Sequence, residues 1–120
     1  MRLNHLDIPV TDVAATRHFF EAMLGFRHLQ TVGADEMAIL MDESGFVLVL
    51  NRLVTDDMQA FPRDFHIGFL QKDEQAVREL HEKFTASGME SVSRLENSDN
   101  SSAFYFVAPG NINVEISWRT

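Results

Sequence analysis

Two short segments of the chain, residues 4–10 (NHLDIPV) and 65–70 (FHIGFL), alternate apolar and other side chains in the way typical of β-strands. Each is followed by helix-cap candidates, Thr11 and Asp12 in the first half and Asp73 in the second, and then by apolar residues at helical spacing. The apolar residues of the first helix are Val13, Phe20 and Leu24, and those of the second are Val77, Leu80 and Phe84. A glycine typical of a helix C-terminus follows each set, Gly25 and Gly88 respectively. The pattern predicts a strand followed by a helix, twice.

Each half then continues with three further predicted strands. They lie at residues 26–31, 37–41 and 46–50 in the first half, and at 89–94, 103–107 and 112–117 in the second. Each half therefore has the pattern βαβββ, an internal repeat. We expect one domain over residues 1–120, made of modules 1–50 and 64–120 with a polar linker at 51–63. The polar stretch 96–102 is predicted to be a mobile loop or lid.

The repeat predicts an α+β fold. One module of about 60 residues would leave one face of its sheet uncovered, and is marginal in size. Two modules can pair into a curved, half-open, eight-stranded mixed sheet that forms a cup, with the helices outside. The same pairing can occur between chains, so we also expect a homodimer.

Three residues whose side chains can bind metals lie in the first or last predicted strands of the two modules. His5 and His66 stand at equivalent places in the first strand of each module, and Glu115 lies in the last strand of the second. Two imidazoles and one carboxylate can hold a divalent ion and leave positions open for water or substrate; Mn, Fe, Ni, Co and Zn all suit such ligands. The alternatives are ordinary strand histidines and a Glu115 paired with Arg94 or Arg119. An inward-facing, unpaired carboxylate would be costly, which favours the metal hypothesis.

Other residues are placed around this candidate site by strand alternation. Asp7 shares a strand face with His5, where it can act as a general base or a weak additional ligand; the alternatives are a partner that orients His5 or a member of a salt bridge. His18, His28 and His81 are expected to be surface residues. The candidate pocket lining, for which ordinary packing or solvent exposure is the alternative, is Leu3, Leu48, Leu50, Tyr105, Asn113 and Ser117.

Composition and charge narrow the function classes. The hydrophobic content of 45% and charged content of 23% are those of a globular domain. The chain has no cysteine, which excludes disulfides, thiolate zinc sites, iron–sulfur clusters and a cysteine nucleophile. A net charge of −8 without basic clusters argues against nucleic acid and anionic membranes as partners. The early charge at the N-terminus does not fit a secretory signal, so we expect a cytoplasmic protein.

The repeat and its histidines resemble the vicinal oxygen chelate superfamily, which includes glyoxalase I, extradiol dioxygenases, fosfomycin-resistance thiol transferases and bleomycin-resistance proteins. The resemblance is carried by Leu3–Leu6 with Phe19–Phe26, by Phe65–Phe69, and by Phe104–Asn111 with Val114–Ile116. It implies paired βαβββ modules and a divalent metal bound by His5, His66 and Glu115.

The sequence also departs from the patterns of individual subfamilies. Aligning Gly45 with Gly110 puts Leu50 at the place where glyoxalase I has a further ligand. Asp7 stands where the thiol transferases tend to carry threonine. The resemblance therefore implies the superfamily and a three-ligand site, without choosing a subfamily.

Three functions fit these observations. The leading one is a metal-dependent enzyme (a lyase, isomerase, transferase, ring-opening enzyme or dioxygenase) that stabilises an oxyanion on a small oxygen-bearing substrate, with Asp7 as proton acceptor. The second is a metal-free dimer of the bleomycin-resistance kind that binds a cationic or aromatic small molecule; the negative charge and the aromatic hairpin favour it. The third is a regulatory or structural dimer with a vestigial site.

Overall fold

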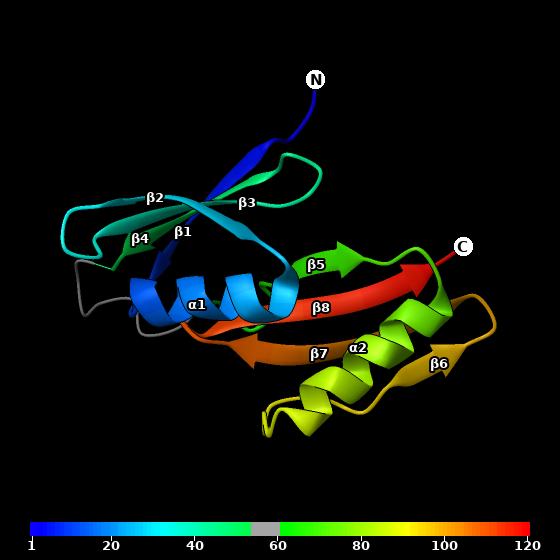
Figure 1. The fold of residues 1–120 in the computed structure, drawn as a ribbon. Helices are drawn as coiled ribbons and strands as arrows, with labels where there is room; N and C mark the ends of the chain where they lie inside the picture. The colour runs from blue at the N-terminus through cyan, green and yellow to red at the C-terminus, as the bar shows by residue number, and fades with distance from the viewer. Residues whose placement is uncertain (54–60) are drawn as a thin grey trace. The chain divides into compact units, whose positions relative to one another are not determined.

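The computed structural model of the chain describes residues 1–53 and 61–120 and has the predicted α+β fold, with a βαβββ order of elements in each half. The chain divides into two compact units, Met1–Phe61 with Pro109–Asn111, and Pro62–Ala108 with Ile112–Thr120. The elements are β1 (His5–Val10), α1 (Val13–Leu24), β2 (Arg27–Val32), β3 (Met37–Met41), β4 (Val47–Arg52), β5 (Ile67–Leu70), α2 (Glu74–Ala86), β6 (Glu96–Ser98), β7 (Ser101–Ala108) and β8 (Ile112–Arg119) (Figure 1). The predicted repeat is thus confirmed.

The first unit is a four-stranded mixed sheet with α1 packed against it. The strand order is β1-β4-β3-β2; β1 runs parallel to β4, and the other neighbours are antiparallel. Asp12 caps α1 by accepting a hydrogen bond from the Ala15 N–H, and Gly25 ends it in the left-handed conformation. The buried apolar side chains are Ile8, Val10, Val13, Phe20, Phe26, Ala38, Leu40, Leu48 and Leu50.

The second unit repeats this plan around α2. Its strand order is β5-β8-β7-β6, with β5 parallel to β8 and the other neighbours antiparallel. Asp73 caps α2 through the Ala76 N–H. The core contains a cluster of aromatic rings in which Phe84 stacks on Phe106 at a centroid distance of 4.6 Å. The buried apolar side chains are Val77, Phe84, Phe104, Phe106, Ala108, Ile112, Val114 and Ile116.

The register of the strands corrects the predicted equivalence of Leu50 and Glu115. Gly68 lies opposite Glu115, and Asp7 lies opposite Val49. Asp7 lies two residues after His5, and Gly68 lies two residues after His66, so Asp7 and Gly68 are equivalent positions of the repeat. The residue opposite Asp7, Val49, is therefore the equivalent of Glu115. The alignment on the turn glycines was wrong by one residue, and such a slip exchanges the two faces of a strand. Leu48 and Leu50 accordingly lie in the core beneath α1, not in the wall of a pocket beside His5.

Two predictions for the second module were also wrong. Residues 96–102, predicted to be a lid, contain β6 and the start of β7. Polar side chains pair these strands: Ser98 Oγ lies 2.8 Å from Ser101 Oγ, and Ser102 Oγ donates to Asn97 Oδ1 at 2.6 Å. Such cross-strand polar pairs need no apolar alternation, which is why the sequence pattern missed them.

Residues 89–94, predicted to be a strand, are not one. The Ser91 and Ser93 hydroxyls accept hydrogen bonds from the backbone N–H groups of Val107 and Tyr105, at 3.1 and 2.9 Å. The two side chains thus take the place that a neighbouring strand would occupy along β7.

The predicted linker at 51–63 begins later than expected. Asn51 and Arg52 are residues of β4, and residues 54–60 lie outside the described part of the chain. No helix in the described residues is long and apolar enough to span a membrane.

The turn before β4 is organised by one carboxylate. Asp42 Oδ1 accepts hydrogen bonds from the Ser44 hydroxyl at 2.7 Å and from the Ser44 and Phe46 N–H groups at 2.9 Å each. Burial raises the pKa of Asp42, but the hydrogen bonds from the Ser44 side chain and from the Phe46, Ser44 and Gly45 backbone outweigh it. The net pKa lies below the ordinary value of 3.8, because these donors stabilise the charged form.

Replacing Asp42 with asparagine should therefore destabilise the protein in a pH-dependent way. Charged hydrogen bonds of this kind contribute about 1–2 kcal/mol. A lowered folded-state pKa means that the contribution is present above pH 3.8 and is lost as the pH falls through the lower folded value. Urea unfolding of both proteins between neutral and strongly acidic pH should show a difference that shrinks below pH 3.8. A difference independent of pH would contradict this role.

Candidate metal centre

The second unit brings two of the three predicted ligands together. His66 precedes β5 and Glu115 lies on β8, next to each other because β5 and β8 pair in parallel. His66 Nε2 lies 3.4 Å from Glu115 Oε2. The Glu115 side chain is 14% exposed and the His66 side chain 46%. In the described residues, the ion pair of Glu115 is with His66 and not with Arg94 or Arg119.

A backbone contact sets which nitrogen of His66 faces the carboxylate. His66 Nδ1 lies 3.0 Å from the Asp64 carbonyl oxygen, which can only accept, so Nδ1 carries a proton and donates. In the neutral ring Nε2 then has a free lone pair directed at another electron-rich atom. Such a contact is unfavourable unless a proton on Nε2 or a cation lies between the two. Backbone support of this kind is common for metal-binding histidines.

Tyr105 completes this cluster from β7. It lies opposite Glu115 in the ladder and packs edge-on against the His66 ring at a centroid distance of 6.3 Å. Burial, the hydrogen bond to Glu115, and the negative charges of Glu115 and Glu96 raise the pKa of Tyr105, against a smaller opposing effect of Arg119. The phenol therefore remains protonated and acts as a hydrogen-bond donor.

Two hollows flank Tyr105 on this unit. One, of about 370 Å³, opens beside His66 and Asn113. The other, of about 430 Å³, opens beside Glu115 and Ser117. Sequence reasoning missed several lining residues, including Arg63, Asp64, Ser91 and Ser93 of the first hollow. The only sequence signal for these lining residues is that Arg63 and Asp64 lie close to His66 in the sequence and that Ser91 and Ser93 come shortly before β7.

His5 and Asp7 lie on β1 of the first unit, on the sheet face away from α1. Both are exposed, whereas Ile8 and Val10 of the same strand are buried. His5 Nδ1 donates to Asn4 Oδ1 at 2.8 Å, which leaves Nε2 free, as in His66. Asp7 Oδ1 accepts a hydrogen bond from Asn51 Nδ2. In both repeat histidines, His5 and His66, the Nδ1 atom is thus engaged, by different acceptors.

The other predicted site residues and histidines are placed as follows. Leu3 precedes β1 and is 79% exposed, while Ser117 is buried on β8. His18 is exposed as expected, but His28 and His81 are half-buried and hydrogen-bonded. His81 Nε2 donates to the Ser93 carbonyl at 2.9 Å, so this histidine has a structural partner.

The residues present fit a divalent metal in part. Metal–nitrogen and metal–oxygen bonds are about 2.0–2.2 Å long, so two donor atoms 3.4 Å apart can reach one ion. In the part of the chain that the structure describes, no group of three or more His, Asp or Glu side chains is arranged to hold a metal. His66 and Glu115 could therefore supply two ligands to a metal ion.

Comparison with known proteins establishes the family. The sequence matches the model of the glyoxalase/bleomycin resistance protein/dioxygenase superfamily over residues 2–116. The chain belongs to this superfamily. No curated protein matches its sequence significantly.

Several solved structures resemble the chain along almost its whole length. A possible glyoxalase from Bacillus cereus is 30% identical, with a TM-score of 0.85 and 97% of each chain covered. The fosfomycin resistance protein FosX from Listeria monocytogenes is 19% identical, with a TM-score of 0.79 over 99% of this chain and 92% of that one. Lactoylglutathione lyase from Agrobacterium tumefaciens is 16% identical, with a TM-score of 0.78, covering 98% and 92%. The last two share the fold.

Proposed function

We propose that the protein is a divalent-metal-dependent enzyme that acts on a small oxygen-bearing substrate. The observation that carries the proposal is the pair of His66 Nε2 and Glu115 Oε2, 3.4 Å apart. The Asp64 carbonyl fixes the imidazole so that its free nitrogen faces the carboxylate. A cation between the two atoms would satisfy both.

His5 is the third ligand of the proposed centre. Its Nδ1 is engaged by Asn4, so its free Nε2 is prepared for a metal in the same way as that of His66. Imidazole and carboxylate ligands suit Mn, Fe, Co, Ni and Zn, and a three-ligand set leaves positions for substrate oxygens. The repeat equivalent of Glu115 is Val49, which cannot bind a metal, so each site has one glutamate.

When bound, the metal would polarise a substrate oxygen and stabilise an oxyanion, as in lyase, isomerase, ring-opening or dioxygenase chemistry. Two side chains of the protein, Tyr105 and Asp7, would supply hydrogen bonding and proton transfer. The Tyr105 phenol, kept protonated by its raised pKa, lies beside Glu115 and His66 and can donate a hydrogen bond. Asp7, fixed by the Asn51 amide, is the proton acceptor.

Because His5 belongs to one module and the other two ligands belong to the second, a homodimer can build the site in two ways. Mixed dimers of His5→Ala and His66→Ala chains distinguish them. If the ligands come from different chains, a mixed dimer contains one complete site and regains metal. If they come from one chain, the mixed dimer contains none.

Metal content tests the proposed function. The purified protein would be stripped with a chelator, reconstituted separately with Mn²⁺, Fe²⁺, Co²⁺, Ni²⁺ and Zn²⁺, and desalted. We expect at least one of these metals to remain at about one ion per chain, because a mixed imidazole and carboxylate set binds such ions tightly. The His18→Ala variant, altered at an exposed histidine outside the site, is the matched control. No retained metal with an intact fold would refute the proposal and favour the metal-free binding protein.

A further inference from the structure

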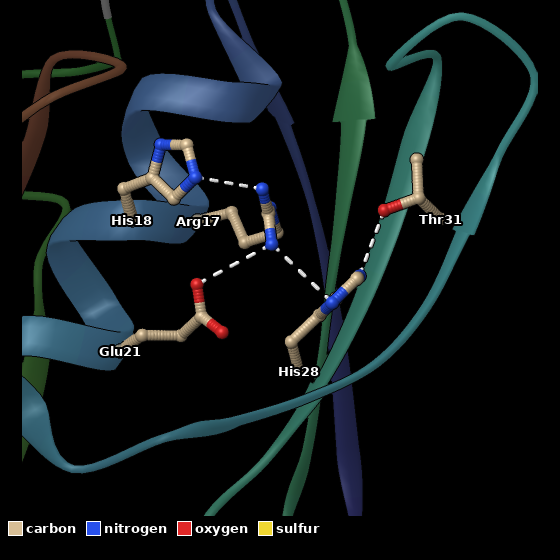
Figure 2. Close-up of polar contacts among 5 residues, drawn as sticks. All are labelled: Arg17, His18, Glu21, His28 and Thr31. Atoms are coloured by element: carbon tan, nitrogen blue, oxygen red, sulfur yellow. Dashed lines mark hydrogen bonds and ion pairs between the residues drawn. The ribbon is translucent and has the colours of Figure 1, made fainter.

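A second histidine cluster lies in the first unit, away from His5 and Asp7. Figure 2 shows that it is built around the guanidinium of Arg17 on α1. Arg17 Nη2 lies 2.7 Å from His18 Nε2, and Arg17 Nη1 lies 3.3 Å from His28 Nδ1 on β2. Glu21 Oε2 lies 3.5 Å from Nη1. One cation is thus shared by two imidazoles and one carboxylate.

The donor and acceptor roles in this cluster are fixed by the chemistry of arginine. A guanidinium has only donors, so His18 Nε2 and His28 Nδ1 must both accept. Each of these nitrogens therefore carries no proton. His28 Nε2, 2.7 Å from Thr31 Oγ1, then carries the ring proton and donates to that hydroxyl. The contacts require both imidazoles to be neutral and assign one tautomer to each.

The guanidinium of Arg17 depends on these two neutral imidazoles as hydrogen-bond acceptors. Its side chain is 19% exposed, and its Nε is buried without a hydrogen-bond partner in the described residues. The 3.5 Å contact with Glu21 is long for an ion pair. If the accepting nitrogen of either histidine gains a proton, an imidazolium faces the guanidinium, and the hydrogen bond becomes a repulsive contact between like charges.

Among the described residues, the contacts of Arg17 include no further titratable group besides His18, His28 and Glu21. α1 packs against β2, β3 and β4. Besides His28, β2 carries Arg27, a further positive charge, and β3 has no titratable side chain. Arg52 of β4 is paired with Glu36 at 3.4 Å. Glu21 is the one negative charge that contacts Arg17 among the described residues.

We propose that the Arg17–His18–His28 cluster is a proton-sensitive latch that holds the edge strand β2 against α1 when both histidines are neutral. Among the described strands, β2 is the outer strand of its sheet and pairs with β3. Its ladder is interrupted by a bulge between His28 and Gln30, which leaves Leu29 43% exposed. An edge strand with an interrupted ladder depends on side-chain contacts such as Arg17–His28, so uptake of protons loosens it.

Amide hydrogen exchange tests the latch directly. Exchange of the amides of Arg27–Val32 would be measured by NMR at about pH 7.5 and about pH 5.5, the range over which imidazoles titrate, and corrected for the intrinsic pH dependence. In the wild type we expect these amides to exchange about tenfold faster, after correction, at the lower pH. Amides of β7, which belongs to the other unit and carries none of the cluster's residues, should not change. Long-range ¹⁵N spectra at pH 7.5 should show the Nε2–H tautomer for His28 and Nδ1–H for His18.

The double variant His18→Gln/His28→Gln isolates the role of the protons. The glutamine amide oxygen can accept from Arg17 and takes up no proton, so the pH response of β2 should vanish. His81→Gln, at a histidine that donates to a carbonyl, should keep the full response. The proposal is overturned if wild-type β2 exchanges equally at both pH values, if the double variant responds as the wild type does, or if His28 holds the Nδ1–H tautomer.

Discussion

Replacing Glu115 with glutamine is expected to weaken metal binding by at least about a hundredfold while the protein stays folded. Residues that only support a metal ligand contribute about 10- to 100-fold to affinity, so the loss of a direct anionic ligand should exceed that range. Glutamine keeps the size of the side chain and an oxygen that can accept from Tyr105. Metal affinity would be measured by competition with a chromophoric chelator, and folding by circular dichroism.

Asp7→Asn is the matched comparison for this experiment. Asp7 is an exposed carboxylate on β1 that accepts from Asn51, and we assign it proton transfer and not metal binding. Its replacement should therefore leave metal affinity within about threefold of the wild type, well inside the change expected for a ligand. Equal affinity losses in the two variants would identify Asp7 as a further ligand. An unchanged affinity in Glu115→Gln would remove Glu115 from the centre.

Replacing Phe84 with alanine is expected to cost about 3–5 kcal/mol of the free energy of unfolding. Phe84 is completely buried on α2, stacked on Phe106 at 4.6 Å and tilted against Phe104 at 5.9 Å. Truncation leaves a cavity at the contact that fixes α2 on β7, because neighbouring rings cannot fill it. Urea unfolding monitored by circular dichroism gives the change.

Leu70→Ala is the control for this prediction. Leu70 lies on β5 and is 65% exposed, so its truncation should change stability by less than about 0.5 kcal/mol. If Phe84→Ala lowers the free energy of unfolding by less than about 1 kcal/mol, the stability of the second unit does not depend on its aromatic core.

The internal repeat made most of the fold predictable. Apolar alternation and helical spacing are strong signals where one face is buried, as in β1 and α1, and the acidic caps mark where the helices begin. The polar strand β6 was not predictable in this way, because Asn97 and Ser98 pair through side-chain hydrogen bonds. Nor was the break at 89–94, where the hydroxyls of Ser91 and Ser93 bond to β7.

For the candidate site, the sequence could predict only which residues are potential ligands, from their types and their positions in the repeat. Position in the repeat singled out His5, His66 and Glu115, but sequence could not show which ring nitrogen of each histidine is free. The acceptors that decide this are an amide at Asn4 and a backbone carbonyl at Asp64. The misplacement of Leu50 has a similar origin, since turn length does not determine register, and a slip of one residue reverses the faces of β4.

The central claim is that His5, His66 and Glu115 bind one metal ion. Pulsed electron paramagnetic resonance on protein loaded with Cu²⁺, used as a paramagnetic probe, counts the imidazoles bound to the metal. The account predicts two imidazoles in the wild type and one in His5→Ala, with the remaining one bound through Nε2. A wild-type spectrum without imidazole, or the same count in the wild type and His5→Ala, would contradict it.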